Sequence, residues 1–146
     1  MKILKANFKI LGLLLILSIL TSCNRDGIEL VYDGQSNYEI VFMGSAAESQ
    51  YKSAEILQRY LQEISGVELE LVDESSQDPN KNKIYVGNIK GEVIKQQEIA
   101  IRTENKNLYI FGGSDMATKY AVYEFLERYL DCRWYAPQVE KIPTSK

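Results

Sequence analysis

The stretch that decides the fold is EIAIRTENKNLYIFGGSDMATKYAVYEFLERYLD, residues 98–131. It opens with two β-rich runs, residues 98–103 and 108–111, separated by a polar turn, and this pattern predicts a β-hairpin. Two glycines then lead into a helix with Ser114 or Asp115 as its N-cap. Charged side chains recur along the end of this helix at i, i+3, i+4 and i+7, while apolar side chains cover a wide opposite face. The helix is therefore expected to bury one side against a sheet.

Another helix and another hairpin are predicted nearer the N-terminus. The β-rich runs at residues 28–32 and 38–42 flank a turn-forming segment, which predicts a hairpin. Ser45 and Glu48 have the spacing of a capping box, in which each residue satisfies a backbone N–H near the other. Apolar residues at spacings of three and four continue from there to Gly66, which is expected to end the helix.

Two further strands and a last extended piece complete the expected order. Residues 67–72 alternate apolar and acidic side chains and so predict a strand with one solvated face. Residues 84–87 predict a short strand, and residues 132–135 predict a final extended segment that Pro137 ends. The order ββαβββ(β)αβ predicts an α/β, or α+β, domain: an antiparallel or mixed β-sheet with two amphipathic helices packed on one face.

The composition is that of one ordered globular domain and excludes several functions. The 146 residues are 45% hydrophobic and 25% charged, with 9 glycines and 3 prolines. There is no histidine, which excludes Ser-His-Asp and Cys-His triads and the His-Glu-x-x-His zinc motif. The formal charge is −3, and it becomes −6 without the three lysines of residues 1–22. Such an acidic chain, with no basic run, is not expected to bind nucleic acid.

The N-terminus has the features of an export signal. Lysines precede an apolar stretch at residues 10–20, which is shorter than the roughly 20 residues of a membrane-spanning helix. Leu20-Thr21-Ser22-Cys23 then resembles the lipobox of bacterial lipoproteins, so residues 1–22 are interpreted as a signal peptide and Cys23 as the lipidated residue that holds the protein on a membrane. Asn24 favours the outer membrane, with a periplasmic or cell-surface location. The alternative is an ordinary cleaved signal with Cys23 as a bystander.

Carboxylates are the first candidates for chemistry because they need no histidine. Glycoside hydrolysis uses two acids about 5 to 10 Å apart, and Glu68 and Glu70 share one strand face at about that spacing. Asp73 and Glu74 are adjacent just beyond the strand. A hydrolase acting through such residues would need a pocket that raises the pKa of a carboxyl group. A solvated strand face and loop explain both pairs without any chemistry.

Two other motifs have simpler structural explanations. Gly112-Gly113-Ser114 stands between a strand and a helix like a phosphate-binding turn, but it lacks the Gly-x-Gly-x-x-Gly spacing and a Walker lysine, so a tight turn into a capped helix is expected. Cys132 has no histidine to activate it and is expected to be a small buried hydrophobe, although two chains could pair through it. No cysteine pair or carboxylate cluster has metal-ligand spacing, so no metal or cofactor site is expected.

Aromatic residues are the remaining candidates for a binding site. The chain has 10 tyrosines and 1 tryptophan, which is many for its length. Sugars stack on exposed aromatic rings, so Trp134 and Tyr135 could form a sugar-binding platform. Alternatively, these two residues anchor the last extended segment in the core or against a following domain.

Much of the chain closely resembles the N-terminal domain of α-glucuronidase-like (family 67) glycoside hydrolases and of related large bacterial lipoproteins. The segments that carry the resemblance are Ala54–Gly66, Ile84–Asn88, Asn107–Ser114, Tyr120–Glu127 and Leu130–Pro137. The most specific of them is Cys-Arg-Trp-Tyr-Ala-Pro, at residues 132–137. One departure is Asp131, where that family usually has glycine.

The resemblance implies an accessory domain, similar to domain 2 of β-hexosaminidases, at residues 28–137. A tether at residues 23–27 precedes it, and a tail at residues 138–146 follows it. In that family the catalytic acids lie on a separate (β/α)₈ barrel of roughly 250 residues, which this sequence, ending at Lys146, does not include. No residue is therefore assigned a catalytic, cofactor-binding or metal-binding role.

The expected function is a lipid-anchored, non-catalytic accessory domain of a glycoside-hydrolase-type protein in carbohydrate metabolism, with a catalytic barrel as its partner. The alternative is a stand-alone surface module that binds a glycan through Trp134 and Tyr135. A third hypothesis is a hydrolase acting through Glu68, Glu70 or Asp73.

Overall fold

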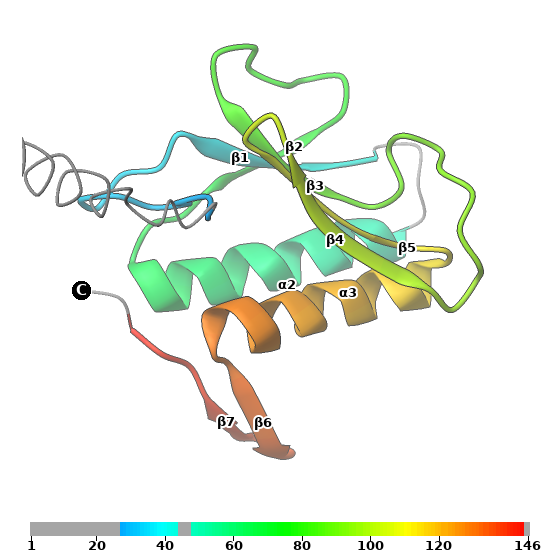
Figure 1. Ribbon diagram of the computed structural model, residues 1–146. Helices are drawn as coiled ribbons and strands as arrows, with labels where there is room; N and C mark the ends of the chain where they lie inside the picture. The colour runs from blue at the N-terminus through cyan, green and yellow to red at the C-terminus, as the bar shows by residue number, and fades with distance from the viewer. Residues whose placement is uncertain (1–26, 44–47, 145–146) are drawn as a thin grey trace, which may run out of the picture.

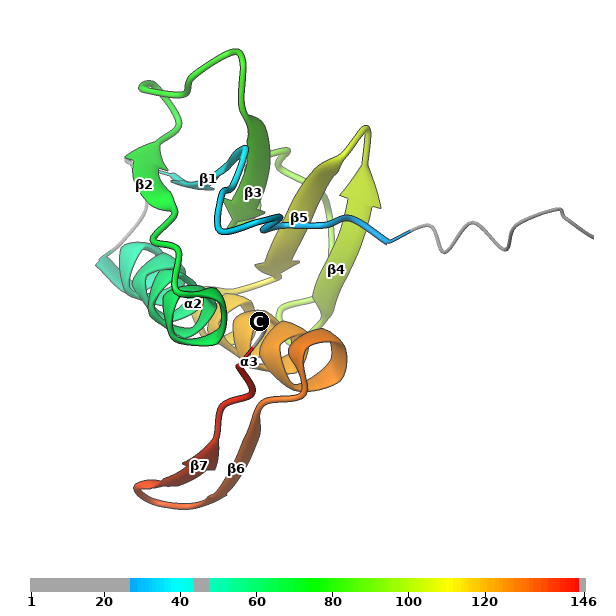
Figure 2. The same ribbon diagram turned by 90° about the vertical axis from the view of Figure 1, so that its left-hand side faces the viewer.

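The computed structural model describes residues 27–43 and 48–144. One face of a five-stranded sheet is covered by two helices that lie side by side, and a small hairpin projects from the opposite side of the helices (Figures 1 and 2). The elements are β1 (Tyr38–Phe42), α2 (Glu48–Ser65), β2 (Glu70–Asp73), β3 (Asn82–Val86), β4 (Ile99–Glu104), β5 (Asn107–Gly112), α3 (Asp115–Leu130), β6 (Arg133–Ala136) and β7 (Val139–Lys141). The predicted fold class, a mixed sheet with both helices on one face, is confirmed.

The main sheet has the strand order β2-β1-β3-β5-β4. β1 pairs in parallel with both β2 and β3, and β3 pairs in parallel with β5. The edge strand β4 runs antiparallel to β5. Helix α2 supplies the crossover that the parallel strands β1 and β2 require. No helix in the described ranges is long and apolar enough to cross a membrane.

The hairpin predicted between residues 28–32 and 38–42 is wrong. The first run is not a strand; it makes a single bridge, in which the backbones of Tyr32 and Gln35 pair across a tight turn at 2.8 and 2.9 Å. Asp33 and Gly34 have positive φ angles in that turn. The second run is β1, and both of its edges are occupied by β2 and β3, so it has no free edge to offer an N-terminal partner.

The hairpin predicted within residues 98–111 is confirmed as β4 and β5. Its register joins Glu104 to Asn107, so the turn consists of Asn105 and Lys106. Both turn residues have positive φ angles, 49° and 69°, which matches the twist of a two-residue hairpin turn.

The first predicted helix is confirmed in the described residues, and the strand after it starts later than predicted. α2 ends at Ser65, and Gly66 follows with a φ of 74°. The capping box involves Ser45, which lies outside the described residues. The amide of Gln58 donates to the carbonyl of Leu69 at 2.7 Å, which holds the chain before β2 against the helix. The predicted strand at residues 67–72 is therefore a connector followed by β2.

Gly112 and Gly113 form the tight turn that the sequence predicts. Glycine is required at both positions because no side chain fits there. A Cβ on Gly112 would overlap the backbone of Ala117, and a Cβ on Gly113 would overlap the carbonyl of Lys95. Ser114 then caps α3 by accepting a hydrogen bond from the backbone N–H of Ala117 at 3.2 Å.

α3 ends at a residue in the left-handed conformation. Asp131 has a φ of 57°, and the N–H of Cys132 donates to the carbonyl of Leu126 at 3.1 Å, which closes the last turn. Glycine would fit this position, since it adopts positive φ without steric cost.

We predict that Asp131→Ala lowers the melting temperature more than Asp131→Gly does. Both substitutions remove the ion pairs of Asp131 with Arg133 (2.9 Å) and Lys141 (3.0 Å). The difference between the two variants therefore reports the cost of a Cβ in the left-handed conformation. Thermal unfolding followed by circular dichroism measures it, and equal melting temperatures would contradict the left-handed end of the helix.

The chain after Pro137 is not simply a tail, because part of it forms β7. β6 and β7 pair antiparallel, from Arg133 with Lys141 to Ala136 with Val139. Gln138 turns the chain back with a φ of 68°. The final extended segment predicted at residues 132–135 is therefore one arm of a hairpin, separate from the main sheet (Figure 2).

The face of the sheet turned away from the helices carries a buried ion pair. The ammonium group of Lys83 on β3 lies 3.2 Å from the carboxylate of Glu39 on β1, and the two side chains are only 8% and 1% exposed. The same carboxylate accepts a hydrogen bond from the N–H of Asp78 at 2.9 Å, and Lys83 donates to the carbonyls of Asp78 and Lys81. The pair thus fastens the loop between β2 and β3 to the sheet.

Candidate functional site

Cys23, the predicted lipidation site, lies outside the described residues. Trp134, the first predicted site residue within them, lies on β6 and is held by hydrogen bonds at its indole nitrogen. The indole N–H is 2.9 Å from the hydroxyl of Tyr60 on α2 and 2.9 Å from the carboxylate of Glu140 on β7. The hydroxyl of Tyr60 in turn donates to the same Glu140 oxygen at 2.6 Å. Burial is the main cause that raises the pKa of Tyr60, so its hydroxyl stays protonated as a donor.

Two tyrosine rings pack against the Trp134 indole edge to face. The ring centroids of Tyr60 and Trp134 are 5.6 Å apart at an interplanar angle of 84°, and those of Tyr123 and Trp134 are 5.1 Å apart at 87°. Together with Glu140, these residues form what we call the Trp134 cluster. Its members come from α2, α3 and both strands of the hairpin, so the cluster joins the hairpin to the helix pair.

Tyr135 does not join Trp134 in a common platform. Successive residues of a strand point to opposite sides, and Tyr135 is 67% exposed whereas Trp134 is half-buried. Trp134 therefore packs between the hairpin and the two helices, and Tyr135 is a solvent-exposed ring. Sequence reasoning missed Tyr60 and Glu140, because nothing local to either residue marks it as a partner of Trp134.

Cys132 is fully buried, as the sequence predicts. Burial is the largest cause that raises the pKa of its thiol, and the nearby carboxylates of Glu140 and Asp131 act in the same direction. The thiol is therefore protonated at neutral pH and is suited to packing rather than to nucleophilic attack.

Three of the four acidic candidates line one shallow hollow beside the edge strand β2, and Glu74 does not; Glu68 lies before the strand and so does not share a strand face with Glu70. Glu68, Glu70 and Asp73 share this hollow with the rings of Phe42 and Tyr51. Glu70 forms an ion pair with Lys81 at 2.8 Å. Hydrogen bonds from Ser75 lower the pKa of Asp73, which is the opposite of what a general acid needs. Among the described residues, no group of three or more Cys, Asp or Glu side chains could hold a metal ion.

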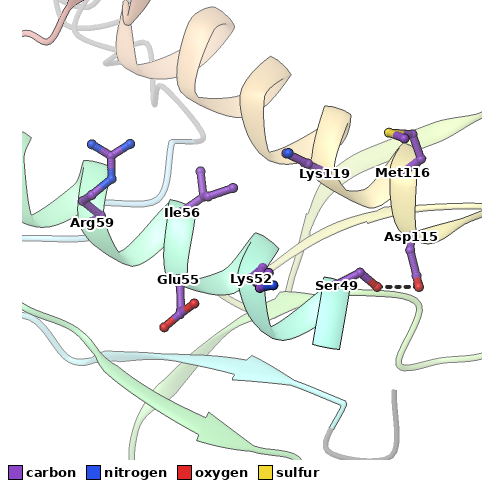
Figure 3. A pocket seen from close by; sticks show the side chains of 8 residues that line it. All are labelled: Ser49, Lys52, Glu55, Ile56, Arg59, Asp115, Met116 and Lys119. Carbon is purple, nitrogen blue, oxygen red and sulfur yellow. Dashed lines mark hydrogen bonds between the residues drawn. The ribbon is translucent and has the colours of Figure 1, made fainter. Parts of the chain in front are cut away.

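A groove that sequence reasoning did not predict lies between α2 and α3 (Figure 3). Its volume is about 660 Å³, and its lining residues are Ser49, Lys52, Glu55, Ile56, Arg59, Asp115, Met116 and Lys119. The α2 members recur at helical spacing on the side of the helix that the predicted apolar face does not use, which is the signal that could have indicated them.

Asp115 fixes the end of the groove where both helices begin. Its carboxylate accepts hydrogen bonds from the hydroxyl of Ser49 at 2.5 Å, drawn in Figure 3, and from the amide of Gln50 at 3.0 Å. The bond from Ser49 is the largest cause that lowers the pKa of Asp115. These bonds join the first turns of the two helices across the groove.

We predict that Asp115→Asn lowers the free energy of unfolding by about 1 kcal/mol at pH 7, a value already reduced for solvent screening. Folding lowers the pKa of Asp115, so its carboxylate contributes to the free energy of unfolding. This contribution is fully present above the pKa of the unfolded state, near 3.8, and it disappears as the pH falls through the pKa of the folded state. The difference between wild type and variant, measured by urea unfolding at several pH values, should thus shrink below about pH 4. A difference that grows on acidification would contradict the prediction.

The groove and the Trp134 cluster adjoin each other on the outer side of the helix pair. Arg59 lines the groove, and its guanidinium lies 4.2 Å from the ring centroid of Tyr60 in the cluster. On α3, Met116 and Tyr120 are 61% and 62% exposed, and Tyr123 continues the same helical stripe to Trp134. We call this the outer helix surface. It combines exposed apolar side chains with cations at the groove, on a chain whose formal charge is negative.

No protein-family model matches this sequence, and no curated protein matches it. Among solved structures, 21 chains match. One of them, described as a GH138 enzyme targeting pectin rhamnogalacturonan II, is 21% identical and aligns over 62% of this chain with a TM-score of 0.48. The chain covers 10% of the length of that enzyme. This is a distant similarity of fold.

Proposed function

We propose that this chain is a lipid-anchored, non-catalytic accessory domain of a glycan-processing protein, and that its outer helix surface docks on a catalytic glycoside hydrolase unit. The observation that carries the proposal is the set of contacts that the Trp134 side chain makes. Its N–H and its ring contact Tyr60, Tyr123 and Glu140, which supports a role of this segment in shaping a surface.

The outer helix surface has the composition of a protein interface. Exposed Met116 and Tyr120 are residue types enriched where proteins associate. Lys119 lines the groove without an ion-pair partner among residues 27–43 and 48–144. A partner with acidic groups at the rim of its interface would complement this cation and orient the encounter. The membrane anchor at Cys23 would hold the complex at the outer membrane or cell surface.

Photo-cross-linking tests the docking. A photoreactive amino acid at Tyr120, on the outer helix surface, is compared in the native cell with the same group at Val93, which is fully exposed on an irregular segment. We expect an adduct from position 120 whose peptides belong to a glycoside hydrolase barrel, and no such adduct from position 93. An adduct with another class of protein, or the same adducts from both positions, would refute the docking.

Two further measurements test the remaining parts of the proposal. The purified full chain is expected to release no product from aryl glycosides or glucuronoxylan fragments, and cleavage would show that it is an enzyme. Mass spectrometry of the N-terminal peptide from the native cell is expected to find a diacylglycerol on Cys23. A peptide that begins at another residue, or an unmodified cysteine, would remove the anchor.

A stand-alone glycan-binding module remains a second candidate, because Tyr135 presents an exposed ring. The single tryptophan is next to it, so Trp134 fluorescence reports binding without a label. Tyr135→Ala is the variant to use, since Trp134→Ala would disturb the hairpin. A saturable change with xylan, chitin or host-glycan fragments that Tyr135→Ala abolishes would favour this function over docking.

A further inference from the structure

A second cavity lies at the end of the molecule where the two helices finish. Its volume is about 700 Å³, within the range of pockets that hold small molecules. Residues 27–36, which we call the N-terminal strap, supply one wall, and the strap crosses in front of the sheet in the view of Figure 2. The C-terminal turns of α2 and α3 and the hairpin β4–β5 supply the others.

The walls of this cavity are mainly apolar. The half-buried side chains of Ile28 and Val31 come from the strap, and the buried side chains of Leu61, Leu108 and Phe125 come from the core. The one cationic residue in the lining, Arg102, pairs through its guanidinium with Glu92. Walls of this composition favour an apolar ligand over a polar one.

Hydrogen bonds hold the strap in a defined shape, so the wall that it gives to the cavity is well defined. The hydroxyl of Ser36 donates to the carbonyl of Leu30 at 2.6 Å, across the turn that the Tyr32–Gln35 bridge closes. The same hydroxyl accepts from the N–H of Tyr38 at 3.2 Å, which ties the strap to the start of β1.

We propose that this cavity seats one fatty acyl chain carried by Cys23 when the protein is outside the bilayer. The proposal rests on the lipidation of Cys23 stated above. Gly27, at the rim of the cavity, is only four residues after Cys23, and four residues span at most about 14 Å. The acyl chain therefore starts within reach of the cavity. Moving its methylene groups from water into an apolar cavity is favourable, which drives the chain inward.

A fluorescent acyl probe tests the cavity directly. The full chain with Cys23→Ala carries no lipid and should bind one equivalent of cis-parinaric acid methyl ester, an uncharged acyl chain. Val31→Trp, made in the same Cys23→Ala chain, fills the cavity from the strap and should weaken binding of the probe at least tenfold. Val93→Trp makes the same substitution at a fully exposed position and should leave binding unchanged. The signal segment is common to all three chains, so it cannot produce a difference between them.

Thr103→Trp provides a second route, because Thr103 lines the cavity from β4 and is exposed, so its replacement disturbs little packing. Thermal unfolding confirms that each variant is folded. No probe binding by the Cys23→Ala chain, or equal binding by Val31→Trp, Thr103→Trp and Val93→Trp, would overturn the acyl site.

The source of the chain is tested on the lipidated protein. Cells are fed a diazirine fatty acid, and the purified wild-type protein is irradiated in detergent. Cross-links from Cys23 to peptides that contain Val31 or Phe125 are expected, and Val31→Trp should abolish them while Val93→Trp retains them. A labelled Cys23 without these cross-links overturns only the proposal that the acyl chain occupies the cavity. An unlabelled Cys23 overturns both the anchor and its seat, whatever the probe binds.

Discussion

Replacing Trp134 with alanine is expected to lower the free energy of unfolding by about 2–4 kcal/mol. The substitution removes a half-buried indole that Tyr60 and Tyr123 contact edge to face. It also leaves Glu140 without its indole donor. An isolated two-stranded hairpin is marginally stable in water, so β6 and β7 should lose their order while the main sheet remains. Chemical denaturation gives the free energy, and hydrogen exchange of residues 133–141 reports the hairpin.

Two matched variants separate the parts of this effect. Trp134→Phe keeps an aromatic ring without the N–H donor, so it should cost about 1–2 kcal/mol. Tyr135→Ala removes an exposed neighbour of the same strand and should leave stability nearly unchanged. Equal losses for Trp134→Ala and Tyr135→Ala would show that the Trp134 cluster does not hold the hairpin.

Local signals in the sequence were sufficient to predict the segment from residue 98 to residue 131. A two-residue turn, a serine cap and helical periodicity each act over a few neighbours, and the structure confirms the hairpin and the helix that they predict. Parallel pairing has no such local signal. Residues 38–42 have the composition of a strand, but only the folded chain shows that their partners are β2 and β3 and not the nearby residues 28–32.

The candidate site was predictable only in part, for the same reason. Trp134 stood out because tryptophan occurs once, and the idea that it anchors the last extended segment was available from the sequence. Its partners Tyr60 and Glu140 were not, since one lies on a distant helix and the other in a segment interpreted as a tail. The groove of Figure 3 exists only because α2 and α3 lie side by side.

Replacing Lys83 with methionine is expected to lower the free energy of unfolding by about 3–5 kcal/mol. The apolar side chain keeps most of the volume but leaves the Glu39 carboxylate buried without its cation. One oxygen of that carboxylate already has no hydrogen-bond partner among the described residues, so the remaining bond from Asp78 cannot compensate. The loop between β2 and β3 should loosen as well, because Lys83 also donates to two of its carbonyls.

The double variant Glu39→Leu/Lys83→Met decides whether the loss comes from the uncompensated charge. With both ions gone, the unfavourable burial of a lone carboxylate disappears, and the double variant should be more stable than Lys83→Met alone. Lys95→Met, which removes the solvent-exposed partner of Glu98, is the control and should change stability little. Suppose that Glu39→Leu lowered the free energy of unfolding by the same amount in the Lys83→Met variant as in wild type. The two residues would then be energetically independent. The ion pair would then not be what holds the loop to the sheet.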